Sequence, residues 1–215
     1  MNRRKFALSW GRKIFFGVSM PVSFLIGLLY LRSFILPESL VDWIFFIASY
    51  IGTFGLLNVL LFFIFYTPII FLMPTYYVSR LWSLLLILLL NILLLVDALS
   101  FSSFHFHLYD FFSQIIWKTG YEYMMSSKVI VSILITTLLV ITVLFWIRGE
   151  MVWRRMQGRF SNPTSSWYIF VIFLCFIAGK AVYFYGPVDE NLAKVFPLHL
   201  SFRPESAFAS STDNR

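Results

Sequence analysis

Apolar residues along this chain gather into five long runs, separated by short polar or basic stretches. The runs cover about 14–36, 44–73, 81–97, 129–147 and 167–185. Each is close to or above the ~20 residues that an α-helix needs to cross a hydrocarbon core about 30 Å thick. The pattern therefore predicts an all-α, polytopic membrane protein, with five transmembrane helices in a single domain over residues 1–185.

Two further stretches do not fit the pattern of a spanning helix. Residues 100–118 mix apolar, aromatic and polar side chains and are interrupted too often to cross a bilayer. We expect an interfacial helix there, lying on the membrane surface. Residues 186–215 are polar and irregular and end in a serine-rich segment, so we expect a linker or tail.

Composition agrees with a membrane protein and narrows the classes of partner. The chain is 60% hydrophobic and only 13% charged, with a net charge of +7, whereas a soluble domain has about 25% charged residues. The basic residues are divided among short loops, which favours membrane topology and anionic lipid contacts over nucleic-acid binding. The single cysteine, Cys175, excludes an internal disulfide.

The distribution of Lys and Arg predicts the orientation. Ten of the 17 lie in residues 1–13, 74–80 and 148–163, on one side of the predicted membrane, and seven lie on the other side together with most of the acidic residues. By the positive-inside rule, the N-terminus is expected in the cytoplasm. Residues 100–118 and the C-terminal tail are then expected on the outer side of the membrane.

The polar residue with the most unusual position is Asp97, a carboxylate at the end of the third apolar run. A carboxylate there is costly unless it is paired. One interpretation is a proton or ion relay. The other, which we favour, is an N-cap for the helix that follows, because Asp is a favourable N-cap residue. Two amides, Asn58 and Asn91, lie inside the second and third runs. They either bond across helices or contact a substrate, and we favour the cross-helix bonds.

His105 and His107 follow Asp97 closely. On a helix they would point about 200° apart and could not share a metal, whereas on an extended segment they would face the same side. A metal site would need one or two more ligands, and Asp97 and Asp110 are the near ones. Interfacial histidines that contact backbone or lipid are the favoured alternative, so we expect no metal and no cofactor.

Motifs of catalysis are missing from the sequence. It contains no glycine-rich phosphate loop, no nucleophile elbow and no His-Glu metalloprotease helix. It also lacks the internal repeat that is typical of many transporters. We therefore expect a protein that works by binding and is not an enzyme.

Four short segments carry a resemblance to a known family. They are Ser9-Trp10-Gly11, Leu94-Leu95-Val96-Asp97 followed by Phe101, Phe104, His105, His107 and Leu108, then Ala181-Val182-Tyr183, and finally Phe196-Pro197-Leu198. With these residues the chain resembles the YejM/PbgA family of Gram-negative inner-membrane proteins. The block from Asp97 to Leu108 is the specific part of the resemblance.

The resemblance implies a regulatory function. Members have five spans, a linker and a periplasmic domain of the alkaline-phosphatase/sulfatase type. They sense lipopolysaccharide at the periplasmic leaflet and bind the adaptor LapB, which otherwise delivers LpxC to the protease FtsH. Two alternatives stay open: a module that binds or transports cardiolipin or other phospholipid, and the membrane anchor of a phosphatase- or sulfatase-like envelope enzyme.

The resemblance also implies candidate binding residues. In the family a basic pair in the periplasmic linker holds the phosphates of lipid A, and in that region this chain has Arg203, with Lys194 earlier in the tail. A single guanidinium can still bind a phosphate through two hydrogen bonds. Partner or anionic-lipid contact is expected at the basic cluster of Arg148, Arg154, Arg155 and Arg159.

Overall fold

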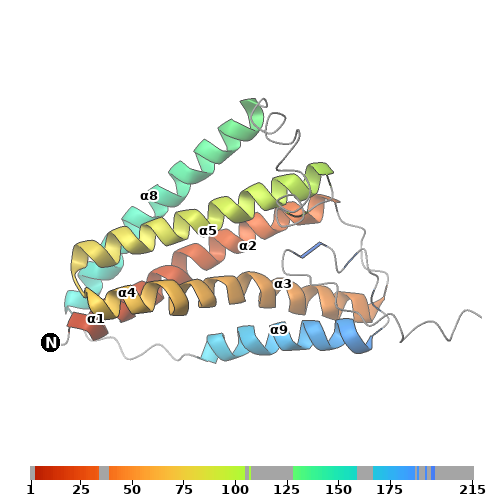
Figure 1. Ribbon diagram of the computed structural model, residues 1–215, viewed down its shortest axis with the longest axis horizontal. Coiled ribbons are helices and arrows are strands. Elements are labelled where there is room, and N and C mark those ends of the chain that lie inside the picture. Colours follow the sequence, from red (N-terminus) through yellow and green to blue (C-terminus); the bar gives the residue numbers. More distant parts are fainter. Residues whose placement is uncertain are drawn as a thin grey trace, which may run out of the picture.

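A computed structural model describes residues 3–33, 39–104, 107, 128–158, 167–186, 188, 192 and 195–196 (Figure 1). The regular elements of this part are all helical: α1 (Arg3–Ile14), η1 (Phe15–Ser19), α2 (Met20–Gly27), η2 (Leu28–Ser33), α3 (Leu40–Leu60), η3 (Leu61–Tyr66), α4 (Thr67–Leu72), α5 (Tyr76–Phe104), α8 (Lys128–Gly158) and α9 (Trp167–Tyr185). Together they form five helices that are long and apolar enough to cross a membrane. The prediction of an all-α, five-span protein is confirmed.

Several helices extend beyond the apolar runs that predict them, α8 among them, which continues past residue 147 to Gly158. The first span begins at Arg3, well before residue 14, so the basic residues near the N-terminus belong to the helix itself. α5 continues to Phe104, so residues 100–104 form its last turn and are not part of an interfacial helix. Apart from His107, residues 105–118 lie outside the described part of the chain.

Prolines account for the two π-helical turns within the first two spans. Pro21 and Pro68 have no N–H group, so the carbonyl four residues before each one loses its helical partner. In both places a short π-helical turn, η1 or η3, directly precedes the segment that contains the proline. The wider turn lets the backbone N–H of Met20 bond the carbonyl of Phe15, and that of Thr67 bond Phe62. Each helix therefore crosses the apolar region without ending.

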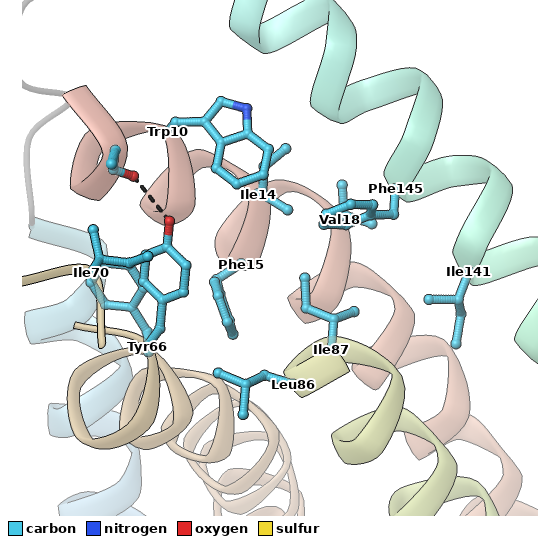
Figure 2. Close-up of a cluster of buried hydrophobic side chains, with 12 residues drawn as sticks. Trp10, Ile14, Phe15, Val18, Tyr66, Ile70, Leu86, Ile87, Ile141 and Phe145 are labelled. Atoms are coloured by element: carbon cyan, nitrogen blue, oxygen red, sulfur yellow. Dashed lines mark hydrogen bonds between the residues drawn. The ribbon is translucent and has the colours of Figure 1, made fainter. Parts of the chain in front are cut away.

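An aromatic core joins the helices at the end of the bundle where the chain begins (Figure 2). Trp10 and Tyr66 are almost fully buried in it, beside Phe145 of α8. The indole N–H of Trp10 donates to the carbonyl of Gly149 at 3.1 Å, and the hydroxyl of Tyr66 donates to that of Ala7 at 3.0 Å. These bonds give each polar tip an acceptor away from water, which lets both large rings stay buried.

α3 and α9 lie side by side along their lengths (Figure 1). Small residues permit their close approach: a Cβ atom added at Gly52 would lie 2.5 Å from the Cα of Phe176, and one at Gly179 would lie 2.6 Å from the Oγ of Ser49. Two backbones pack directly against each other, as is common where membrane helices associate through small residues.

α8 is attached mainly at its C-terminal half. Its N-terminal end leans away from α5 (Figure 1). Ile141 and Phe145 are fully buried. Nearer the N-terminal end, Ile135 and Leu139 are 57% and 61% exposed. At these two positions α8 therefore presents apolar side chains to the surroundings of the bundle.

Candidate functional site

Asp97 is the centre of a buried polar cluster at the end of the bundle opposite the N-terminus. It lies on α5 and is only 6% exposed. The hydroxyl of Tyr30, on η2, donates to its Oδ2 at 2.6 Å, and the Nδ1 of His107 lies 2.9 Å from the same oxygen. The cluster thus joins the end of the first span, α5 and the chain beyond α5.

Aromatic rings enclose this cluster. The imidazole of His107 stacks on Phe101, with ring centroids 4.7 Å apart and an angle of 18° between the planes. The ring of Tyr30 lies 5.9 Å from each of these two rings. A carboxylate that is removed from water needs donors in compensation, and Tyr30 and His107 both supply one, provided that the Nδ1 of His107 carries its hydrogen.

This geometry corrects one interpretation of Asp97. The residue does not cap a helix that begins after it, because α5 runs without a break from Tyr76 to Phe104. Its side chain instead points toward the first span and His107. The extra turn of helix after Asp97 is what brings Phe101 over the imidazole.

The other residues of the motif are placed only in part. Phe104 is the last residue of α5, but its side chain is outside the described part, as is His105 altogether. Among the described residues, no group of three His, Cys, Asp or Glu side chains is arranged to hold a metal ion. The expectation that His105 is an interfacial histidine in contact with backbone or lipid therefore stays a prediction.

A second polar network lies in the middle of the bundle. Asn58 donates to the Oγ of Ser23 at 3.0 Å, Ser23 donates to the Oδ1 of Asn91 at 3.1 Å, and Asn91 donates to the Oγ of Ser19 at 3.3 Å. All four residues are fully buried. The prediction that both amides bond across helices is confirmed, and the network connects the first, second and third spans.

The basic end of the bundle carries a third cluster, around one acidic residue. Glu150 on α8 lies 2.9 Å from the Nε of Arg154 and 3.3 Å from the Nη1 of Arg80. Arg80 also packs over the ring of Trp146, with its guanidinium carbon 3.7 Å from the ring centroid. Two cations share one carboxylate, so the cluster keeps an excess positive charge.

The predicted basic residues are distributed as follows. Arg148 and Arg154 lie on α8, and Arg154 is strongly exposed, at 76% of its side-chain surface. Arg155 is also on α8, although its side chain is outside the described part, and so is the whole of Arg159. The candidate lipid contacts Lys194 and Arg203 likewise lie outside the described residues, and both remain predictions.

Two residues of these clusters, Tyr30 and Glu150, were not named from the sequence. Tyr30 lies inside an apolar run with nothing nearby to mark it, and only the fold brings it to Asp97. Glu150 stands four residues before Arg154, a spacing at which opposite charges meet on a helix, but the helix predicted over 129–147 ends before both residues.

Comparison with known proteins places the chain in a family. No curated protein matches it. A family model described as "Domain of unknown function (DUF3413)" matches residues 1–198, nearly the whole chain and all five spans. The chain therefore belongs to the DUF3413 family.

Proposed function

We propose that this chain is the membrane domain of a non-catalytic regulator of lipopolysaccharide synthesis, of the YejM/PbgA kind. It would meet lipopolysaccharide at the periplasmic leaflet of the inner membrane and a LapB-like adaptor at the other side, and so control the proteolysis of LpxC. The family match over residues 1–198 includes every segment that carries the resemblance to YejM/PbgA.

The observation that supports the proposal best is the convergence of the most specific motif. Asp97, Phe101 and His107 are dispersed over a helix and the chain beyond it, yet they meet in one cluster with Tyr30. Residues that only match an apolar pattern would have no reason to bond one another. The cluster holds the chain that leaves α5 against the first span, at the leaflet where lipid would be sensed.

α5 offers a physical connection between the two ends. It is one helix of 29 residues, anchored near its start through Arg80 and Glu150 and near its end through Asp97. A rigid helix with a polar anchor at each end can pass a displacement at one leaflet to the other, provided that an anchor has two arrangements. Lipopolysaccharide bound near Arg203 or Lys194 would act through the Asp97 end, and the adaptor through the exposed Arg154.

Co-purification tests this proposal. The chain is extracted in mild detergent and its partners are identified by mass spectrometry, with a LapB-like adaptor and lipopolysaccharide as the expected result. Replacing both Arg154 and Arg155 by Ala is expected to reduce recovery of the adaptor. The matched control is Lys5→Ala, which removes an exposed charge from α1 at the same end.

A separate arm addresses the lipid. Arg203→Ala is expected to lower the lipopolysaccharide recovered and leave the adaptor contact at the opposite side in place. Recovery of phospholipid without the adaptor, from membranes in which another known LapB contact survives, would refute the regulator and favour the lipid-handling alternative. Recovery of a phosphatase- or sulfatase-like protein instead would favour an enzyme anchor.

A further inference from the structure

A cavity opens at the basic end of the bundle, away from the Asp97 cluster. Its volume is about 600 Å³, and its lining comes from the start of α1, the turn between α4 and α5, the start of α5 and the late part of α8: Arg3, Phe6, Ala7, Pro74, Thr75, Tyr76, Tyr77 and Trp153. These segments gather at one end of the molecule (Figure 1). Nothing in the proposed function uses this space.

The walls of the cavity are stiff and aromatic. Trp153 packs against Phe6 and Tyr76, with ring centroids 4.5 and 4.2 Å apart. Both neighbours also line the cavity, so the three rings hold one another in place. Aromatic rings with a polar edge are typical of the membrane interface, where headgroups lie.

The charge around the cavity is positive. Arg3 lines it directly and is exposed. A second cation, Arg80, donates a hydrogen bond to the hydroxyl of Tyr76, which is one of the lining residues. Arg80 is largely buried, and its Nε and Nη2 have no hydrogen-bond partner among the described residues. Since Arg80 shares Glu150 with Arg154, its charge is only partly neutralised, and an anion in the cavity would be favoured.

The rim adjoins apolar side chains that point outward. Leu72 is 77% exposed, Met73 60% and Tyr77 80%, and they stand where a spanning helix ends and the next begins. A ligand with a charged head and apolar chains would cover both the cavity and this rim, whereas a small soluble anion would use only the cavity.

We propose that this cavity binds the phosphate headgroup of an anionic membrane phospholipid, with Arg3 against the phosphate and the acyl chains along Leu72 and Met73. Arg suits this role because its planar guanidinium forms paired hydrogen bonds to phosphate oxygens. The site lies at the end of the bundle where the adaptor would bind, but its lining includes neither Arg154 nor Arg155, so its test and that of the proposed function have separate outcomes.

Native mass spectrometry of the full chain in neutral detergent tests the site. Phosphatidylglycerol and phosphatidylcholine with identical acyl chains are titrated separately, and phosphatidylglycerol is expected to bind about tenfold more tightly. Arg3→Ala is expected to weaken phosphatidylglycerol by about tenfold, equivalent to ~1.4 kcal/mol, and to leave phosphatidylcholine unchanged. Lys5→Ala, an exposed cation on α1 that does not line the cavity, is expected to change neither.

A second pair of variants tests the shape of the site. Tyr77→Ala removes an exposed lining ring and is expected to weaken phosphatidylglycerol binding, whereas Tyr185→Ala removes a ring that is 92% exposed elsewhere and is expected to have no effect. Circular dichroism and gel filtration check that each variant folds.

Three results would overturn the assignment. The first is equal binding of the two lipids, and the second is equal loss in Arg3→Ala and Lys5→Ala, which would indicate diffuse attraction to a basic surface. The third is displacement of phosphatidylglycerol by soluble glycerol 3-phosphate at similar concentration. That result would mean that the cavity takes a free phosphate and that the acyl chains contribute nothing.

Discussion

Replacing Tyr30 by Phe tests the Asp97 cluster most directly. The change removes one hydroxyl and keeps the ring that packs against Phe101 and His107. It deletes the 2.6 Å hydrogen bond to Oδ2 of Asp97. Because Asp97 is only 6% exposed, water cannot readily replace the lost donor, and the Nδ1 of His107 remains 2.9 Å from that oxygen.

The size of the effect depends on the charge of Asp97. A hydrogen bond between neutral groups within a membrane protein contributes about 0.6 kcal/mol on average, whereas a bond to a charged group contributes about 1.5–3 kcal/mol. With an ionised Asp97, Tyr30→Phe is therefore expected to lower the free energy of unfolding by about 1.5–3 kcal/mol. With a protonated Asp97, the loss would be several times smaller.

The measurement is unfolding of the purified chain in mixed micelles of mild detergent and dodecyl sulfate, followed by circular dichroism. Tyr185→Phe is the matched control, because that ring is 92% exposed, and no change is expected. The same substitution at Tyr30 is then made in an Asp97→Asn background, where its cost is expected to fall to about 0.6 kcal/mol.

The double-mutant cycle distinguishes an ionised Asp97 from a neutral one. If Tyr30→Phe costs the same small amount in both backgrounds, Asp97 is not an ionised acceptor, and the account of a carboxylate held by two donors is wrong. If the cost is large in the wild-type background alone, the charge of Asp97 is what makes the cluster stable.

Two further predictions concern helix packing and the central network. Gly52→Ala would place a Cβ atom 2.5 Å from the backbone of Phe176, so we expect α3 and α9 to separate and the free energy of unfolding to fall by ~2 kcal/mol in the same assay. The control Gly17→Ala meets nothing within 4 Å and should be neutral or slightly stabilising. Equal effects of the two changes would contradict the α3–α9 contact. Asn91→Leu is expected to lower the free energy of unfolding by ~1–2 kcal/mol. Asn58→Leu is expected to lower it by less, because the Oδ1 of Asn58 has no hydrogen-bond partner among the described residues. The reverse order would show that the network is arranged differently.

Much of the fold follows from the sequence alone. Five apolar runs are enough to predict five spanning helices, because backbone groups in hydrocarbon must bond within their own segment. The interior positions of Asn58 and Asn91 predict cross-helix bonds for the same reason, since buried amides need partners. These inferences need only the solvent and the local order of residues.

The interpretation of Asp97 shows where local order stops being sufficient. The end of an apolar run suggests a helix boundary, and a carboxylate at a boundary suggests a cap. Hydropathy cannot reveal that α5 continues to Phe104, because a helix continues through polar residues when they have partners in the bundle. Tyr30 supplies that partner, and it is far from Asp97 in the sequence.

The sequence by itself determined the class of protein, the number of spans and the need of Asp97, Asn58 and Asn91 for partners, because polar groups within an apolar run are costly unless they are bonded. Only the tertiary structure decided which residues form those pairs. Tyr30 with Asp97 and His107, Arg80 with Glu150, and the wall of the cavity from α1, α5 and α8 all depend on how the helices pack. That packing is set by close contacts such as Gly52 against Phe176, and it cannot be read from any single helix.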